Sequence, residues 1–265
     1  MKIFPLNKED LQDIAHLQPA GWNDIIPPFI FYADSPFCHP VKISRGTRIA
    51  GVGCAILFPT SGWLAHIIVD PYYRNKGIGT SITSYLMEWL QKNNCSTLQL
   101  IATDAGEPVY RKLGFKPVMK YHFYSGNFSE GPDPAPIRLY EGKYREEILH
   151  LDRYVTGDDR KELLYPHFPS MKIYVEHDRI QGYYAPFLGE GQILAITTAA
   201  GIELLKFKHF QRDTRTVIPE KNLRASEFLK QPGFRFERKA LRMISGEKRE
   251  WHPECIYSRI GGNLG

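Results

Sequence analysis

The stretch Val69-Asp70-Pro71-Tyr72-Tyr73-Arg74-Asn75-Lys76-Gly77-Ile78-Gly79-Thr80 decides how this chain is expected to fold. The residues before it, 63–69, are apolar and rich in branched side chains, which predicts a buried strand. The residues after it are apolar at helical spacing, which predicts a helix with one buried face. A glycine-containing turn from a strand into a helix presents free backbone N–H groups and the positive end of the helix dipole. Such a turn suits a phosphate or pyrophosphate group.

Two common phosphate-binding loops do not fit this turn. A P-loop requires G-x-x-x-x-G-K-[ST], and no lysine follows a second glycine here. A dinucleotide-binding loop requires G-x-G-x-x-G, but Ile82 stands at the position of the third glycine.

The remaining pattern, V-D-P followed by R-x-x-G-x-G and an amphipathic helix, resembles motif A of the GCN5-related N-acetyltransferases, the GNAT family. In that family the loop holds the pyrophosphate of acetyl-CoA. The resemblance implies acetyl-CoA as co-substrate, and it implies a mixed α/β fold with a central sheet flanked by helices. The residues that it implies for cofactor binding are Ile67, Ile68, Val69, Arg74, Asn75, Lys76, Gly77, Ile78, Gly79, Thr80, Thr103 and Tyr110.

A second segment supports the same family. Residues 98–102 read as a strand, and Gly114 suits the left-handed cap that ends a helix, with Phe115 returning to the core. The run Tyr110 to Phe115 resembles the family's motif B, Y-x-x-x-G-F. By this resemblance Tyr110 is the general acid that protonates the departing CoA thiolate, although a tyrosine that only packs on the helix is the alternative.

The remaining catalytic and acceptor residues are less clearly marked. A backbone N–H near Ile68 or Val69 is expected to polarise the thioester carbonyl. His66 is the one titratable residue of its strand, so it is either the general base or a packed histidine. Strand alternation would place His66 and Ile68 on one face. Four residues that follow the first predicted helix form either the acceptor pocket or ordinary packing: Trp22, Asn23, Phe29 and Tyr32.

Composition divides the chain into two lobes. We expect a catalytic GNAT domain in residues 1–124 and a Gly/Pro/Ser-rich linker in residues 125–135. Residues 136–265 repeat the short patterns I-x-G and G-F of the first lobe but lack R-x-x-G-x-G, which predicts a degenerate GNAT-like domain without a CoA site. Coincidence between common turn sequences is the alternative. The chain also resembles a two-domain bacterial branch of the family with an acetyltransferase-like C-terminal domain. The charged residues Asp152, Arg153, Asp158 and Arg160 form either a structural network or part of the acceptor site.

Charge, cysteine spacing and hydropathy argue against nucleic-acid-binding, zinc-binding and membrane-spanning proteins. The net charge of +5 is spread along the chain, so nucleic-acid binding is not expected. The four cysteines form no C-x-x-C or zinc spacing, and no apolar run is long enough for a membrane span. We therefore expect a cytoplasmic monomer or homodimer with no metal and no membrane partner.

The leading hypothesis is an acetyl-CoA-dependent N-acetyltransferase that modifies an amine of a small acceptor by direct transfer. A non-catalytic acyl-CoA-binding or regulatory module is the alternative. The sequence does not indicate which amine is the acceptor.

Overall fold

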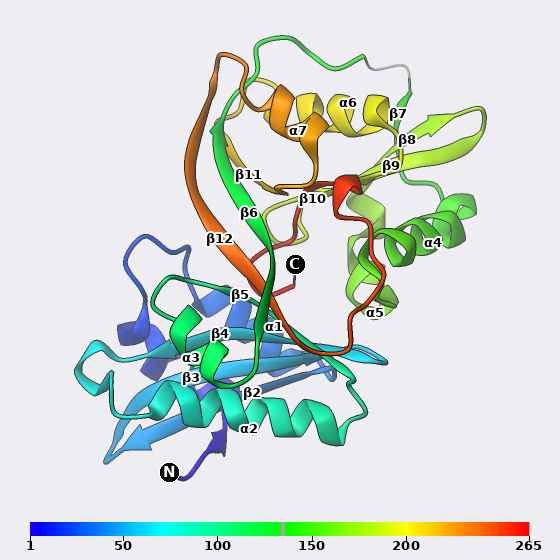
Figure 1. Cartoon of the computed structure of the whole chain (residues 1–265). Coiled ribbons are helices and arrows are strands. Elements are labelled where there is room, and N and C mark those ends of the chain that lie inside the picture. Colours follow the sequence, from blue (N-terminus) through cyan, green and yellow to red (C-terminus); the bar gives the residue numbers. More distant parts are fainter. Residues whose placement is uncertain (134–135, 265) are drawn as a thin grey trace. The chain divides into compact units, whose positions relative to one another are not determined.

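The computed structural model describes residues 1–133 and 136–264 and divides them into two compact units (Figure 1). Unit 1 comprises Met1–Pro117, Met243–Lys248 and Gly262–Leu264. Unit 2 comprises Val118–Arg242 and Arg249–Gly261. Two short C-terminal segments therefore belong to the N-terminal unit.

Unit 1 contains a mixed sheet. Its strands lie in the order β1 (Phe4–Pro5), β2 (Cys38–Arg45), β3 (Arg48–Leu57), β4 (Ser61–Val69) and β5 (Thr97–Ala102). The end of β12 (Phe234–Gly246) follows β5. Strands β1 to β4 pair antiparallel, whereas β4 and β5 are parallel.

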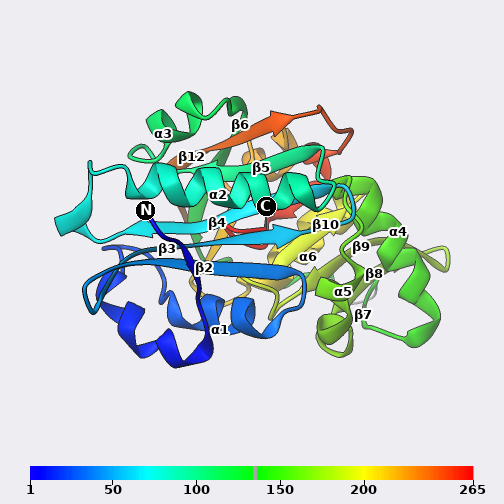
Figure 2. The same cartoon turned by 90° about the horizontal axis from the view of Figure 1, so that it is seen from below.

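Helices cover both faces of this sheet, as Figures 1 and 2 show for α1 (Ile26–Asp34) and α2 (Ile78–Lys92). Strand β3 is accordingly buried along nearly its whole length. Close packing of α2 requires glycine beneath it, because an added Cβ at Gly53 would lie 2.6 Å from Ile82 Cγ2. The predicted strand and helix around the glycine-containing turn are confirmed.

The other unit 1 helices are short. Helix α3 (Glu107–Lys112) follows β5, and three 3-10 helices are η1 (Lys8–Asp10), η2 (Gln12–Leu17) and η3 (Pro71–Tyr73). The segment after Asn7, which has the residue pattern of a first helix, forms the two separate 3-10 turns η1 and η2.

Unit 2 contains three neighbouring long strands: β6 (Lys116–Gly126, from Val118 onward), β11 (Thr214–Pro219) and the main part of β12. A second sheet has the order β13 (Ile256–Ser258), β10 (Gln192–Ala195), β9 (Arg179–Ala185), β8 (Lys172–Glu176) and β7 (Ile137–Leu139). The helices are α4 (Arg145–Thr156), α5 (Lys161–Leu164), α6 (Thr198–His209) and α7 (Leu223–Phe228), with 3-10 turns η4 (Gly142–Tyr144), η5 (Tyr165–Ser170) and η6 (Pro253–Cys255). One hydrophobic core of unit 2 joins α6 and α7 to the strands.

The compact units have different bounds from the domains expected from composition. Strand β6 continues through residues 116–126, so the expected end of the first domain at residue 124 falls inside a strand. Of the expected linker, Pro134 and Ala135 lie outside the described residues, as does Gly265 of the second domain. The division into a catalytic domain and a degenerate copy stays a prediction.

Candidate functional site

The turn between β4 and α2 leaves the start of the helix without a side-chain cap. Gly77 is the N-cap residue at φ +80° and ψ 1°, a conformation that favours glycine. The first helical hydrogen bond runs from Ser81 N–H to Gly77 O at 2.9 Å. The N–H groups of Ile78, Gly79 and Thr80 precede this bond, so they stand outside the helical ladder and can meet an anion.

A buried carboxylate anchors the turn. Asp70 Oδ1 accepts from Tyr72 N–H at 2.9 Å, and its Oδ2 accepts from Arg48 Nε at 2.9 Å. Burial by itself would raise the pKa of Asp70, but the Tyr72 hydrogen bond, Arg48 and His16 together lower it below its usual value. Asp70, the aspartate of the V-D-P motif, therefore stabilises the conformation of the turn. The sequence analysis assigned no role to this residue.

The basic residues of the turn are exposed. Arg74 Nε donates to Val69 O at 3.3 Å, which folds this side chain back along the turn. Lys76 Nζ lies 4.9 Å from the centre of the Tyr72 ring and 5.4 Å from that of Tyr73. Both cations remain accessible beside the free N–H groups of α2. The Ile78 side chain is buried, so only the backbone of that residue can meet a ligand.

Strand β4 carries a bulge in the middle of this region. Val52 pairs with Ile68 and Cys54 with Ala65, so His66 and Ile67 together face the single residue Gly53. His66 has φ +46°, which is rare for a residue other than glycine. The expected strict alternation along β4 is therefore wrong, because the extra residue changes the direction of the strand.

Strands β4 and β5 separate beside the bulge. Their parallel pairing covers Ser61 to Trp63 and Thr97 to Gln99, although β4 continues to Val69 and β5 to Ala102. Beyond Trp63, the backbone N–H and C=O groups on this edge of β4 can form hydrogen bonds with a ligand.

His66 lies in an aromatic cluster formed by three of the four predicted acceptor residues. Its ring centre is 6.0 Å from that of Trp22, 5.8 Å from that of Phe29 and 5.6 Å from that of Tyr32. Asn23 is exposed, and its backbone oxygen accepts from Gln18 Nε2 at 3.1 Å. A hollow of about 350 Å³ adjoins Trp22 and is lined by Ala15, Gln18, Trp22, Asp24, Ile25 and Ile26.

A hydrogen-bond chain fixes the His66 ring. Its Nδ1 lies 2.7 Å from Tyr32 Oη, and Asn263 Nδ2 donates to the same hydroxyl at 2.8 Å. Burial lowers the pKa of His66 to about 4, so the imidazole is neutral at physiological pH. Asn263 was missed by the sequence analysis, because it is 231 positions from Tyr32 and belongs to no motif.

Tyr110 lies on α3 in a half-buried position, with its ring centre 6.0 Å from that of Phe115. Burial raises the pKa of Tyr110 to about 12, so its hydroxyl keeps its proton at neutral pH. Gly106 makes room for the ring, because an added Cβ there would lie 2.8 Å from Tyr110 Cε2. Thr103 begins the turn into α3, and its Oγ1 accepts from Gly106 N–H at 3.2 Å.

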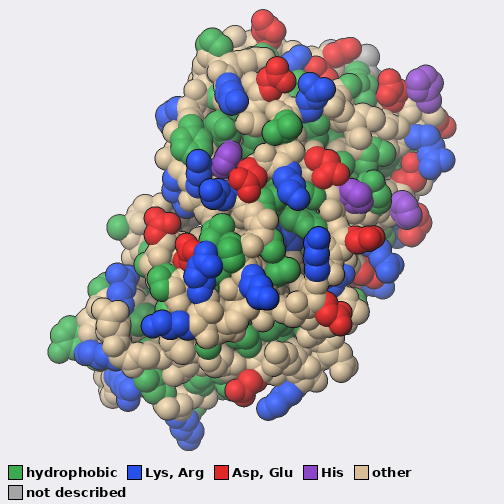
Figure 3. All heavy atoms as spheres, in the orientation of Figure 1, with side chains coloured by type: hydrophobic (Ala, Val, Ile, Leu, Met, Phe, Trp, Pro, Cys, Tyr) green, Lys and Arg blue, Asp and Glu red, His purple; other side chains and the backbone are tan. Residues whose placement is uncertain are grey.

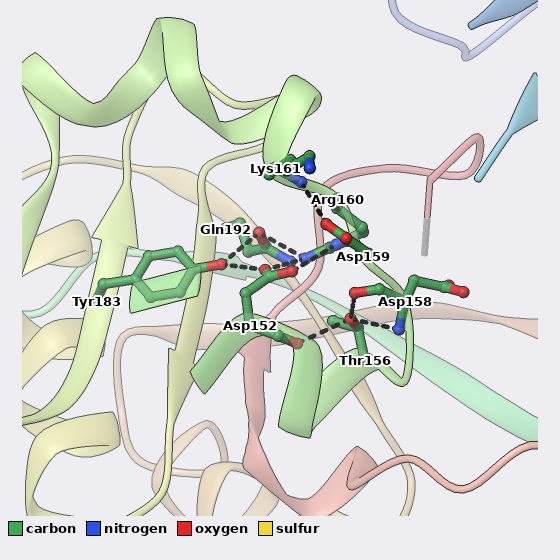
Figure 4. Close-up of polar contacts among 8 residues, drawn as sticks. All are labelled: Asp152, Thr156, Asp158, Asp159, Arg160, Lys161, Tyr183 and Gln192. Carbon is green, nitrogen blue, oxygen red and sulfur yellow. Dashed lines mark hydrogen bonds and ion pairs between the residues drawn. The ribbon is translucent and has the colours of Figure 1, made fainter. Parts of the chain in front are cut away.

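Charged residues of α4 and of the turn after it form a closed network in unit 2 (Figure 4). Arg160 donates to Asp152 through Nε at 3.0 Å and Nη2 at 2.5 Å, and to Gln192 at 3.1 Å. Tyr183 donates to Asp152 Oδ2 at 2.6 Å. These groups are buried and satisfy one another, which favours the structural interpretation, and Arg153 is exposed.

The comparison with protein families agrees with the geometry of the turn. The model of the acetyltransferase (GNAT) family matches residues 7–115, the region that contains β2 to β5, α2 and α3. This region of the chain is therefore similar to the GNAT family. The similarity supports acyltransferase activity in general.

Two curated proteins resemble the GNAT region. An uncharacterized N-acetyltransferase of Bacillus subtilis (strain 168) is 30% identical over 85 residues, which are 31% of this chain and 34% of that protein. Glucosamine 6-phosphate N-acetyltransferase of Trypanosoma brucei brucei is 29% identical over 87 residues, 30% of this chain and 56% of that protein. The chain thus spans about a third of the length of the Bacillus subtilis protein and about half of the length of the Trypanosoma brucei brucei protein.

A solved structure shares the fold of this chain over its whole length. A candidate acetyltransferase from Pyrococcus horikoshii superposes with a TM-score of 0.83 at 19% identity, covering 100% of this chain and 95% of that one. Among the described residues, no group of three or more His, Cys, Asp or Glu side chains could hold a metal ion. In the same residues, no helix combines the length and the apolar character needed to cross a membrane.

Proposed function

We propose that this protein is an N-acetyltransferase that transfers the acetyl group of acetyl-CoA directly to an amine. The observation that carries the proposal is the uncapped start of α2, which follows a bulged strand whose pairing with β5 ends early. Together these features supply donors for a pyrophosphate and a strand edge for the rest of an extended ligand.

The residues of the turn fit this ligand. Gly79 has an ordinary backbone conformation, and an added Cβ would meet Val69 Cγ2 at 3.6 Å, a normal contact. Neither packing nor backbone geometry therefore requires glycine at this position. Glycine at position 79 leaves the N–H groups of α2 open to a ligand. We therefore attribute this glycine to ligand binding and not to a requirement of the fold. The cofactor set expected from motif A is retained here as a proposal.

When bound, acetyl-CoA supplies the thioester. The amine nitrogen forms the new N–C bond, the C–S bond breaks, and the departing thiolate needs a proton. Tyr110 can donate it, since its raised pKa keeps the hydroxyl protonated. Backbone N–H groups near the bulge, around Ile68, are candidates to polarise the carbonyl.

The attacking ammonium must also lose a proton. His66 is neutral and hydrogen-bonded to Tyr32, but its pKa of about 4 makes it a poor site to hold that proton. We propose that His66 and Tyr32 orient the acceptor and pass its proton to solvent. The ionisation of the amine, and not that of His66, then sets the pH dependence of the rate near neutrality.

We propose a single acetyl-CoA site per chain. Helix α6 of unit 2 also follows a strand, but its N-cap residue Thr197 accepts from Ala200 N–H through its own Oγ1 at 3.4 Å. The start of α2 has a glycine in this position and no side-chain cap. The contrast supports a second lobe that does not bind CoA.

The acceptor is proposed to be a small amine. Glucosamine and glucosamine 6-phosphate deserve the first test, because one relative is named for the second compound. Lys and Arg are interspersed with Asp and Glu on the face in Figure 3, which argues against a nucleic-acid partner. The four cysteines are free thiols, which fits the cytoplasm as the proposed location.

A screen with acetyl-CoA and a panel of amines tests the activity. Thiol release and the mass of the acetylated product should both depend on an amine and should be lost in Gly79→Val. The matched control is Gly142→Val, a glycine of η4 whose added Cβ would meet nothing within 4 Å. Acetyl-CoA binding without any accepted amine would support the non-catalytic alternative.

A further inference from the structure

Two arginines of unit 2 share one aromatic ring. Arg238 lies on β12 and Arg259 follows β13, and both approach Phe123 of β6. The guanidinium carbon of Arg238 is 3.8 Å from the centre of the Phe123 ring, and that of Arg259 is 4.7 Å from it. The backbone N–H of Arg259 donates to Val217 O at 3.0 Å, which ties this residue to β11. Strands β12, β6 and β11 lie side by side in the sheet (Figure 1), and Phe123 of β6 contacts both arginines.

Arg238, Arg259 and the neighbouring Arg215 together carry more positive charge than Glu190 and Glu237 balance. Arg259 Nε donates to Glu190 Oε2 at 3.4 Å, a long contact for an ion pair. Arg259 is only 3% exposed, yet its Nη1 has no hydrogen-bond acceptor among the described residues. Arg238 is exposed and contacts the Phe123 ring, and the nearby carboxylates of Glu190 and Glu237 act to raise its pKa.

A buried guanidinium with an unsatisfied N–H donor is costly, because the lost hydration of that donor is not replaced. The second cation nearby adds repulsion. Burial lowers the pKa of Arg238, the neighbouring Arg259 and Arg215 lower it further, and Glu190 and Glu237 partly offset this effect. An anion bound to these guanidinium groups would reduce both penalties. Guanidinium groups bind carboxylates and phosphates through paired N–H donors.

We propose that Arg238 and Arg259 form a binding site for the carboxylate or phosphate group of a small molecule. Glu190 accepts from Arg259 in the free protein and competes with that ligand. The aromatic ring of Phe123 holds the guanidinium planes through cation–π contacts and so orients their donors. The site lies within unit 2 and does not depend on the acetyltransferase proposal.

Calorimetric titration with inorganic phosphate and, separately, with citrate tests this site. Sodium chloride at matched ionic strength corrects for screening. The wild-type protein should bind at least one of the two anions saturably, and Arg238→Gln should weaken that binding about tenfold. Tighter binding of phosphate would identify a phosphate group as the ligand, and tighter binding of citrate would identify a carboxylate.

Two further variants separate the proposal from general effects of charge. Arg235→Gln removes an equal charge from the same strand, where Arg235 pairs with exposed Asp213 at 3.3 Å, and should leave the affinity within about twofold. Glu190→Gln should tighten binding about threefold, a gain that damage to the fold cannot produce. The absence of saturable binding in the wild-type protein, or an equal loss in Arg235→Gln, would overturn the proposal.

Discussion

Lowering the pH from 7 to 4 tests the environment assigned to His66. Burial sets its pKa at about 4 in the folded protein, against about 6.5 in an unfolded chain. Between these values the unfolded state takes up a proton that the folded state does not. The contribution of His66 to the unfolding free energy is therefore complete above pH 6.5 and decreases as the pH falls towards 4. The difference corresponds to about 3 kcal/mol of unfolding free energy from this residue.

Urea unfolding at a series of pH values measures this loss, and His66→Asn isolates it from His209, which also has a lowered pKa of about 4. Asparagine tolerates the positive φ of position 66 and cannot titrate. The variant should lose about 3 kcal/mol less than the wild type between pH 7 and pH 4.

His177→Asn controls for the substitution itself, since His177 has φ +49° in an exposed turn. A pH titration of the histidine Cε1–H resonances by NMR measures the midpoint of His66 directly. A His66 midpoint near 6.5, or parallel pH curves for wild type and His66→Asn, would show that burial does not lower the pKa of His66.

Three further substitutions probe the site and the second unit. Tyr110→Phe keeps the ring and should lower kcat about 10²–10⁴-fold with little change in KM for acetyl-CoA; a kcat within about twofold of wild type would remove Tyr110 from the chemistry. Gly106→Ala should displace the Tyr110 ring through its 2.8 Å approach and lower kcat while acetyl-CoA affinity holds, so an unaffected kcat would contradict the packing argument. Arg160→Met leaves buried Asp152 without its cation and should destabilise unit 2 by about 3–5 kcal/mol in urea unfolding; a loss below about 1 kcal/mol would show that the ion pair is not structural.

Local sequence patterns predicted the part of the site that is built from neighbouring residues. The strand before Val69, the helix after Gly77 and the glycine that ends α3 follow from periodicity and cap chemistry, and all three are present. Gly114 and Gly233, the glycines of the G-F patterns in the first and second predicted lobes, both have positive φ after a short helix, at +88° and +101°. The short-range rules succeed because each of these features depends on a few adjacent residues.

Features that depend on distant residues were not predictable. The bulge at His66 arises from the register between β3 and β4, which a single strand does not encode. Asn263 reaches Tyr32 from the other end of the chain. Strand β12 returns to unit 1 although it follows the second predicted lobe. Each of these features is a product of tertiary pairing, so residue spacing carries no signal for it.

Calorimetric titration of the whole chain with acetyl-CoA is the decisive experiment for the site at the start of α2. We expect saturable binding of one molecule per chain, lost in Gly79→Val and retained in Gly142→Val, with both variants folded by thermal melting. Binding of two molecules per chain would contradict the assignment of the site to the start of α2 alone. Unchanged affinity in a folded Gly79→Val would show that the pyrophosphate does not bind there.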